Sequence, residues 1–326
     1  MQKNNITIAL ICAPGGHFEQ MLNLSDFFNN YKHFWITKKN AQTESILKNE
    51  KKYYLSPSHF KKPWTYIPHF PKIMKIYWTE KPSHALSTGS GRTCFVPFLL
   101  AKLFNIKFIY IDTFSRVNNF TSFAIFLNKL GHPIFTQWRD NIKKNVSYIG
   151  PLFKEEKINN INNSKEEHIF VTVGNRLEPF VRILESVEML VNKGIITEKV
   201  VLQAGNTKYE SNRMEIFDWC DTKRIDDLIQ HAKYVITQES AGIASKCLRF
   251  KKKFIEMPRD YAFGELPAQG DMKEDLQFKL EELGYTKVVN NTAELEMAIK
   301  NIDKLKTGFK FDNRLAISTL TNLVEK

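Results

Sequence analysis

The sequence predicts an α/β protein of two units, each a parallel sheet covered by helices. Its 326 residues are too many for one ordinary domain of about 100–200 residues and fit two. In both halves of the chain, runs typical of buried strands alternate with helical patterns, and this alternation indicates parallel sheets. Apolar residues (43%) and charged residues (25%) are at ordinary levels for a globular chain, so a collagen-like or disordered protein is excluded.

In the first half, strands and helices alternate around two glycine turns. Residues 6–13 form an apolar run typical of a buried strand, and one helix through residue 27 follows the first turn. Residues 84–87 form a second strand, which leads through the other turn into a helix expected over 95–104. A strand over 107–111 comes next, so this half predicts the first parallel sheet.

The second half repeats the alternation after a linker. Residues 154–168 are mostly Glu, Lys and Asn, which is linker composition. We therefore expect a first domain over 1–153 and a second over 169–326, with the last helix free to pack back on the first domain. The second domain has a helix from about residue 179, another after 238–242, and strands over 169–174, 200–205, 234–237 and 254–258.

The sequence carries no signal for secretion or for a membrane span. Its apolar runs are far shorter than the roughly 20 residues that a spanning helix needs, and residues 1–5 do not begin a signal peptide. The four cysteines share no CxxC or metal-ligand spacing. We expect reduced thiols in a cytoplasmic protein, with neither disulfides nor a zinc site.

The formal net charge of +12 lies entirely in the first half. Residues 1–150 carry a net charge of +13, whereas residues 151–326 carry −1. A basic half-molecule attracts an anionic partner, which could be nucleic acid, a phosphate-bearing substrate or the acidic leaflet of a membrane.

One basic segment, residues 59–78, interleaves aromatic side chains with lysines, as segments at a membrane headgroup boundary do. Single-stranded nucleic acid also binds aromatics beside cations, and a core helix with a solvated lysine face has a similar composition. No nucleic-acid motif accompanies the segment, so we favour an anionic membrane surface and expect no nucleic-acid partner. The residues expected to face the membrane are Lys61, Lys62, Trp64, Tyr66, Lys72, Lys75 and Trp78.

The first glycine turn, Gly15-Gly16-His17, directly follows a predicted strand. Ligands of open α/β sheets bind beyond the carboxyl ends of the strands, so His17 would face a ligand. Its imidazole could then act as a general base toward a substrate hydroxyl. A tight turn with an incidental histidine produces the same pattern.

Two further loops place glycines before predicted helices. Thr88-Gly89-Ser90-Gly91 does not complete a dinucleotide fingerprint, because Cys94 occupies the third glycine position, and this weakens a nicotinamide hypothesis. Ser240-Ala241-Gly242 would offer backbone N–H groups to a diphosphate, unless Ser240 only caps the helix. The chain has no Asp-x-Asp pair, so we expect no metal and no other cofactor.

Further motifs follow these turns in a consistent order along the chain. In residues 1–153 they are Gly15-Gly16-His17, 87–91, 110–117, Gln137-Trp138 and 150–152. In residues 169–290 they are 169–174, Pro179-Phe180, Ile236-Thr237, Ala241-Gly242, Pro258-Arg259 and Gly264-Glu265. Their order resembles the PssD-type and PssE-type halves of bacterial exopolysaccharide glycosyltransferases, joined in one chain. It is also similar to the two subunits of the eukaryotic dolichol-diphosphate GlcNAc transferase, and distantly to MurG.

The resemblance implies a GT-B fold, in which two Rossmann-like domains face each other across a cleft. The implied activity is inverting, metal-independent transfer of a hexosyl or glycuronosyl group from a UDP-sugar to a polyprenyl-diphosphate-linked saccharide. This transfer would form a β-1,4 link in capsule or exopolysaccharide biosynthesis. The enzyme would lie peripherally on the inner face of the plasma membrane.

The resemblance also implies site residues. His17 would be the base, with Asp112 a weaker candidate. The acceptor would contact Gly15, Gly16, Thr88, Gly89, Ser90, Gly91 and Arg116. The donor would contact Gly174, Asn175, Glu239, Ser240, Ala241, Gly242, Arg259, Glu265 and Gln269.

The chain departs from the family in its donor loop. Glu239 stands where the family usually has glycine, and a carboxylate there weakens diphosphate binding unless it points away or binds sugar hydroxyls. Leu266 replaces the histidine that usually follows Gly264-Glu265, and Gln20 replaces a glutamate of the eukaryotic proteins. Two alternatives therefore stay open: a noncatalytic GT-B partner subunit, and a nucleotide-sugar epimerase, which has the same fold.

Overall fold

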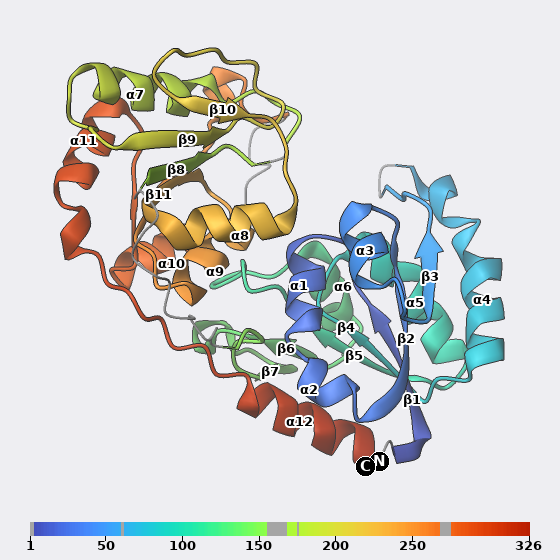
Figure 1. Ribbon diagram of the computed structural model, residues 1–326. Coiled ribbons are helices and arrows are strands. Elements are labelled where there is room, and N and C mark those ends of the chain that lie inside the picture. Colours follow the sequence, from blue (N-terminus) through green and yellow to red (C-terminus); the bar gives the residue numbers. More distant parts are fainter. Residues whose placement is uncertain (1–2, 60–61, 155–167, 175, 268–274) are drawn as a thin grey trace. The chain divides into compact units, whose positions relative to one another are not determined.

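The computed structural model describes residues 3–59, 62–154, 168–174, 176–267 and 275–326. The chain forms two compact units (Figure 1). The first contains Met1–Lys154 together with Phe311–Lys326, and the second contains Glu155–Lys310. Most of the linker expected from the sequence lies outside the described residues.

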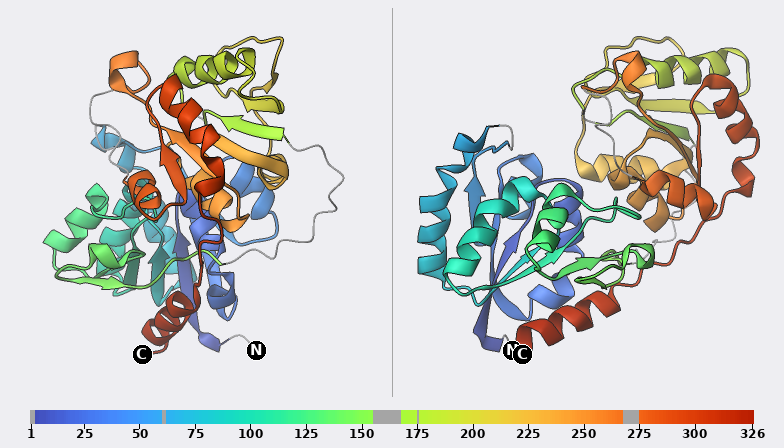
Figure 2. Two further views of the ribbon diagram at one scale, coloured as in Figure 1. Left: turned by 90° about the vertical axis from the view of Figure 1, so that its left-hand side faces the viewer. Right: turned by 180° about the vertical axis from the view of Figure 1, so that it is seen from behind.

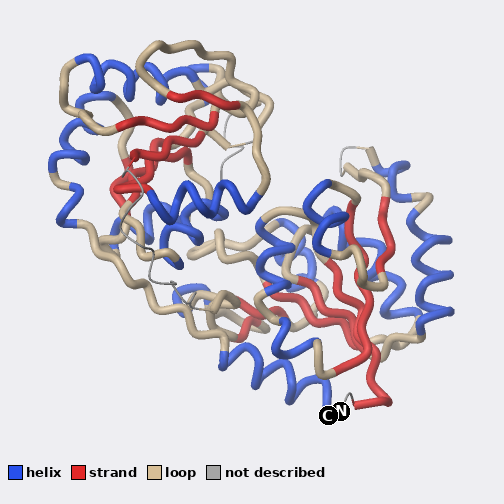
Figure 3. Tube along the Cα trace, viewed as in Figure 1, coloured by secondary structure: helices blue, strands red, loops and turns tan. Residues whose placement is uncertain are grey.

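The first unit is built on a seven-stranded parallel sheet in the order β3-β2-β1-β4-β5-β6-β7 (Figure 3). Successive side chains of β1 enter opposite cores: Ile8 and Leu10 pack on one face, and Ala9 and Ile11 on the other. Both faces are therefore covered, as parallel sheets require. The strands are β1 (Lys3–Ile11), β2 (Tyr31–Lys38), β3 (Lys52–Leu55), β4 (His84–Ser87), β5 (Lys107–Ile111), β6 (Ile134–Thr136) and β7 (Val146–Tyr148).

Helices supply the rest of both cores. Helices α4, α5 and α6 pack with Ala9 and Ile11, whereas α1, α2 and α12 pack with Ile8 and Leu10. The helices are α1 (Gly16–Leu22), α2 (Ser25–Phe28), α3 (Ala41–Ile46), α4 (His69–Glu80), α5 (Gly91–Leu103), α6 (Ser122–Lys129) and α12 (Arg314–Glu325). Single 3₁₀ turns are η1 (Pro63–Tyr66) and η2 (Arg139–Asn141).

The last helix, α12, is attached to the first unit at both of its ends (Figure 2). Before its first turn, Asn313 Nδ2 donates a hydrogen bond to Asn23 O at 2.8 Å. At its other end, Tyr31 Oη donates to Glu325 Oε1 at 2.7 Å. Between these bonds the helix buries one face, made by Ala316, Leu320 and Val324.

The second unit has a six-stranded parallel sheet in the order β10-β9-β8-β11-β12-β13. Its strands are β8 (His168–Thr172), β9 (Lys199–Gln203), β10 (Glu215–Phe217), β11 (Ala232–Gln238), β12 (Phe254–Met257) and β13 (Thr286–Val288). Its helices are α7 (Val181–Asn192), α8 (Thr222–His231), α9 (Ala241–Arg249), α10 (Leu276–Glu282) and α11 (Thr292–Lys300), with turns η3 (Tyr261–Phe263) and η4 (Ile302–Lys304).

Every strand expected from the sequence is present, with ends that differ by at most three residues. The single helix expected through residue 27 is wrong, because the chain forms two helices there. The first ends at Leu22, and Asn23 Nδ2 closes it by donating to Glu19 O at 2.8 Å. Helix α5 begins at Gly91, earlier than the expected residue 95.

No helix among the described residues is long and apolar enough to cross a bilayer. Three of the four free cysteines are buried, and Cys220 is half-buried. Burial raises the pKa of the Cys94 thiol to about 12, so this group stays protonated and unreactive at neutral pH.

Three histidines of the first unit, His69 and His84 buried and His132 half-buried, predict a pH dependence of its stability. Burial lowers the pKa of His69, His84 and His132 below the ordinary value of 6.5. As the pH falls through 6.5, the unfolded chain therefore binds protons before the folded chain does. Above pH 6.5 these groups should not lower the free energy of unfolding. As the pH decreases below 6.5, the free energy of unfolding should decrease.

Urea unfolding of the full chain at pH 7.5 and 5.5, monitored by hydrogen exchange in peptides of the first unit, measures this decline. The variant His84→Phe removes one titrating group and should lose less stability between the two pH values. An equal loss in wild type and variant would contradict the assignment to His84.

Candidate functional site

His17 is held at the start of α1, beyond the carboxyl end of β1, and is half-buried. Its Nδ1 lies 3.0 Å from Thr88 O. A carbonyl only accepts hydrogen bonds, so Nδ1 carries the proton and Nε2 of the neutral ring holds the lone pair. Nε2 makes no hydrogen bond to any described residue. Burial lowers the pKa of His17, although the bond to Thr88 raises it, so the ring is neutral at pH 7 and able to accept a proton.

Gly89 makes the room that this imidazole occupies. Its φ is +110°, and a Cβ at this position would lie 2.6 Å from His17 Nδ1 and 2.7 Å from Cε1. Thr88 Oγ1 donates back to His17 O at 2.7 Å. The two glycine turns therefore hold each other, and only a residue without a side chain at position 89 permits this contact.

Asp112 directly follows β5 and is fully buried. Its carboxylate accepts hydrogen bonds from Thr121 N at 3.0 Å, Thr121 Oγ1 at 2.8 Å and Thr113 N at 3.0 Å. Burial raises the pKa of Asp112, and these hydrogen bonds oppose that shift. Because both oxygens accept from protein donors, we expect Asp112 to position the loop after β5 rather than to take a proton from substrate.

The other predicted acceptor residues lie in the same turns. Gly15 and Gly16 are exposed, and Ser90 precedes α5 in the left-handed region with φ of 69°. Gly91 packs closely on α6, since a Cβ there would lie 2.5 Å from Phe123 Cβ. Arg116 donates to Asn119 Oδ1 at 2.9 Å within its own loop.

In the second unit, loops that follow three strands converge at Gly174. Its φ is +72°, and a Cβ there would lie 1.9 Å from Gln238 Nε2. Gly205 follows β9, and a Cβ there would lie 2.3 Å from Gly174 O. Glycine at position 174 leaves room for the Gln238 side chain, and glycine at position 205 allows close approach to the Gly174 carbonyl.

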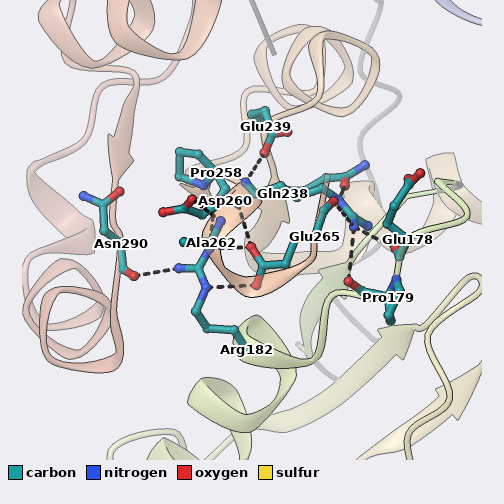
Figure 4. A network of polar contacts seen from close by, with 11 residues as sticks. Glu178, Pro179, Arg182, Gln238, Glu239, Pro258, Asp260, Ala262, Glu265 and Asn290 are labelled. Atoms are coloured by element: carbon teal, nitrogen blue, oxygen red, sulfur yellow. Dashed lines mark hydrogen bonds and ion pairs between the residues drawn. The ribbon is translucent and has the colours of Figure 1, made fainter. Parts of the chain in front are cut away.

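Arg259 joins these loops from inside the second unit, and Figure 4 labels two of its partners, Glu178 and Gln238. It is 5% exposed, and each of its three guanidinium nitrogens donates to the protein. Nε donates to Gln238 Oε1, Nη1 to Glu178 O at 2.8 Å and Glu265 O at 3.2 Å, and Nη2 to Val173 O at 3.0 Å. We therefore expect Arg259 to affect a donor through the loops that it fixes.

Glu265 is likewise engaged by the protein (Figure 4). Arg182 binds its carboxylate with two hydrogen bonds, of 3.0 Å to Oε1 and 2.8 Å to Oε2. Asp260 N adds a third at 2.7 Å to Oε2. Arg182 also donates hydrogen bonds to Pro258 O and Asn290 O. This paired geometry rigidifies the loop after β12.

The predicted anion loop at the start of α9 contains both a cap and a buried carboxylate. Ser240 Oγ accepts from Ile243 N at 3.4 Å, so the capping contact is present. Glu239 is 5% exposed, and its Oε2 accepts from Arg259 N at 2.8 Å. Its Oε1 has no hydrogen-bond partner among the described residues, and burial raises the pKa of this carboxyl. Ala241 and Gly242 are half-buried at the helix start.

Two predicted donor residues, Asn175 and Gln269, lie outside the described residues. Within the described ranges, no group of three or more His, Cys, Asp or Glu side chains is arranged to hold a metal ion.

The basic aromatic segment forms η1 and α4, and it exposes large apolar side chains. Trp64 is 61% exposed and Trp78 74% exposed. Two exposed tryptophans are not typical of a core helix with only a solvated lysine face. The exposed members of the segment include Lys62, Trp64, Ile67, Lys72, Met74, Lys75 and Trp78, hereafter the α4 surface.

Tyr66 does not belong to the α4 surface, so its predicted membrane contact is wrong. Its side chain is 5% exposed and lies in the core of the first unit, with its ring centroid 5.5 Å from that of Phe95. The 3₁₀ turn directs Tyr66 inward while Trp64 stays outside. Lys61 lies outside the described residues.

Four residues that the fold brings to the strand ends were not predicted from the sequence: Arg182 and Gln238 in the second unit, and Lys38 and Arg92 in the first. Lys38 ends β2, whose apolar run at residues 34–36 is a detectable strand signal. The rule that ligands bind at the carboxyl ends of strands would then have indicated Lys38.

No protein-family model and no curated protein sequence matches the chain. Solved structures match its fold over nearly the whole length. The UDP-GlcNAc 2-epimerase of Methanocaldococcus jannaschii is 13% identical, with a TM-score of 0.71 over 98% of this chain and 100% of that one. MurG of Acinetobacter baumannii is 12% identical, with a TM-score of 0.62 over 98% and 99%. The kitacinnamycin glycosyltransferase is 12% identical, with a TM-score of 0.64 over 98% and 94%. The chain thus has the GT-B fold.

Proposed function

We propose that this protein is an inverting, metal-independent glycosyltransferase that moves a sugar from a UDP-sugar to a polyprenyl-diphosphate-linked saccharide in capsule or exopolysaccharide assembly. The observation that carries the proposal is the state of His17. Its ring is neutral, its Nδ1 proton is bound by Thr88 O, and its Nε2 has no partner among the described residues. Such a group at the end of a strand in a GT-B fold suits removal of a proton from an acceptor hydroxyl.

The second unit supports a nucleotide-sugar donor. Its loops after β8, β9 and β11 meet at two glycines, and the start of α9 presents the positive end of the helix dipole beside them. Solved GT-B structures similar to this chain include an epimerase described with UDP-GlcNAc and UDP and a protein described with UDP. We therefore expect the diphosphate of the donor to bind at this edge of the sheet.

The proposed reaction moves one proton and exchanges one bond. His17 Nε2 takes the proton of the acceptor hydroxyl while that oxygen bonds to the anomeric carbon of the donor. The bond from this carbon to the UDP oxygen breaks, UDP leaves, and the configuration at the carbon inverts. Backbone N–H groups at the start of α9 would stabilise the leaving diphosphate.

The α4 surface supports an acceptor presented at the cytoplasmic face of a membrane. A triple variant in which Lys62, Lys72 and Lys75 are all changed to Gln should bind anionic vesicles about a hundredfold more weakly at low salt, since each lysine contributes about 1 kcal/mol. Co-sedimentation with phosphatidylglycerol vesicles measures it. A matched variant with Lys208, Lys223 and Lys304 changed to Gln removes the same charge from exposed positions of the second unit. Equal binding by both variants would contradict the assignment.

Calorimetric titration with UDP, GDP and a panel of UDP-sugars in EDTA, without acceptor, tests the donor site. We expect one UDP-sugar to bind tightly without metal. UDP release with a polyprenyl-diphosphate-linked saccharide then tests transfer. Absence of both binding and release would instead support a noncatalytic GT-B partner subunit.

A second candidate is a nucleotide-sugar epimerase, which the fold comparison favours. The epimerase from Methanocaldococcus jannaschii has a higher TM-score, 0.71, than MurG, 0.62. An epimerase would convert UDP-GlcNAc with no acceptor present, whereas a transferase would leave it unchanged. Incubation of the protein with UDP-GlcNAc alone separates the two.

A further inference from the structure

Two cationic side chains of the first unit lie at the carboxyl end of its sheet, beside the turn that holds His17. Lys38 is the last residue of β2 and pairs in register with Leu55, the last residue of β3. Arg92 is the second residue of α5 and directly follows the glycine turn that contains Gly89.

Hydrogen bonds between turns bring these positions together. Gly15 N donates to Gln42 Oε1 at 2.9 Å, which joins the turn after β1 to the start of α3, the helix that follows β2. Ser58 Oγ donates to Arg92 O at 2.9 Å, which joins the loop after β3 to the start of α5. The contact of His17 with Thr88 joins the turns after β1 and β4. All four chain segments therefore meet at one end of the sheet.

Neither cation has an anionic partner in the described part of the chain. No hydrogen bond or ion pair of the Lys38 ammonium or the Arg92 guanidinium occurs there. The adjacent Lys39 differs, because its Nζ lies 3.0 Å from Glu44 Oε1. Burial lowers the pKa of Lys38, and the positive charge of Arg92 lowers it further.

This arrangement is unfavourable for Lys38 without a ligand, whereas Arg92 is exposed to solvent. A half-buried ammonium loses part of its hydration, and a second cation nearby repels it. An anion placed between the two charges would reverse both effects. The positive end of the dipole of α5, a helix of 13 residues, adds to the attraction.

We infer that Lys38 and Arg92 together bind a phosphate group of the acceptor's diphosphate beside His17. This inference rests on the proposed function for the identity of the acceptor, whereas the pairing of the two cations with a phosphate rests on the turn geometry and on their lack of an anionic partner among the described residues. A phosphate could also come from the headgroup of an anionic lipid, and the test separates these two sources.

The test titrates inorganic pyrophosphate into the full-length protein with UDP present at saturation, so that a donor site in the second unit is occupied. Lys38→Gln and Arg92→Gln should each weaken pyrophosphate binding about tenfold, and the double variant about a hundredfold, as expected for charge-assisted hydrogen bonds. Arg92→Lys keeps the charge and should recover part of the affinity. Lys39→Gln is the matched control and should bind like wild type.

A second arm measures co-sedimentation with phosphatidylglycerol vesicles. The double variant should sediment with vesicles like wild type, because the α4 surface is intact. If it lost vesicle binding and kept pyrophosphate binding, the site would belong to lipid headgroups and the inference would be overturned. Equal pyrophosphate affinity in wild type and double variant would overturn it as well. UDP binding in the same titrations reports on the proposed function separately, so failure of one does not imply failure of the other.

Discussion

Replacement of His17 with alanine is expected to lower the transfer rate about 10²–10⁴-fold while the affinity for the UDP-sugar changes little, which is the usual contribution of a general base. The reason is the tautomer that the fold selects, with the proton on Nδ1 held by Thr88 O and the lone pair on Nε2. Steady-state release of UDP measures the rate, and calorimetry measures donor affinity. Full activity in His17→Ala would remove His17 from the mechanism.

A matched control is His33→Ala. His33 is also a half-buried histidine of the first unit, and its ring packs on Phe28 with centroids 4.9 Å apart. Its Nδ1 lies 3.1 Å from Tyr31 O, in β2, rather than in the glycine turns. We expect this variant to lose stability without a comparable loss of transfer rate, so a large loss of rate in both variants would indicate a general effect of unfolding.

The state of His17 also predicts how kcat/KM depends on pH. Burial lowers the pKa of His17 from its ordinary value of 6.5, so the ring stays neutral as the pH falls through 6.5. The value of kcat/KM should therefore decline only at a lower pH, where His17 becomes protonated. A midpoint of the acid limb above 6.5 would contradict this assignment.

Gly89→Ala should reproduce much of the His17 defect without touching the histidine. The added Cβ would lie 2.6 Å from Nδ1, and φ of +110° strains any side chain there. The imidazole would be forced from the Thr88 carbonyl, so we expect a large fall in kcat with an unchanged second unit. Gly131→Ala is the control for backbone strain, because its φ of +70° is also positive and its Cβ would contact nothing within 4 Å.

Replacement of Arg259 with methionine is expected to destabilise the second unit by about 3–5 kcal/mol, the range seen when one partner of a buried charged network is removed. The guanidinium is the common donor for Val173 O, Glu178 O and Glu265 O. Without it these carbonyls stay buried with fewer partners, and the buried Glu239 carboxylate keeps its bond to the backbone N of residue 259 but loses a nearby positive charge. The affinity for UDP should also fall, because the loops become less ordered.

Hydrogen exchange, peptide by peptide, is the suitable measurement because it separates the two units. Exchange should accelerate in β8, β11 and β12 and stay unchanged in the first unit. The control Arg213→Met changes an exposed arginine of the same unit and should leave exchange in these strands unchanged. Unaltered exchange around β8 in Arg259→Met would show that the network contributes little to stability.

Much of the fold could be predicted from the sequence, since periodic apolar runs are local signals. The strands at residues 84–87 and 107–111 were predicted with the bounds that the structure has. The strands that were not predicted are β2, β3, β6, β7, β10 and β13, and all of them except β2 have only three or four residues, which carry little periodicity. Residues 84–87 are as few, but the glycine turn that follows them marks the end of that strand. Tyr66 was misplaced for a related reason: composition places a segment near a surface but does not say which side chain turns inward.

The candidate site divides in the same way. The glycine turns and His17 were predictable, because small residues after a buried strand mark the end where ligands bind. The engagement of Asp112 by Thr121 and of Glu265 by Arg182 was not, since the partners are 9 and 83 residues apart and no local pattern joins them.

The sequence by itself determined that this protein is a pair of parallel α/β units with a basic first half and a histidine after its first strand. Only the tertiary structure decided what those groups can do. Thr88 selects the tautomer of His17, Gly89 gives the ring its space, and Lys38 is left beside Arg92 without a carboxylate. Hydrophobic periodicity is a property of a few residues that are neighbours in the sequence. The position of a proton, the space for a ring and the lack of a charged partner depend instead on groups that only folding brings within a few ångströms of each other.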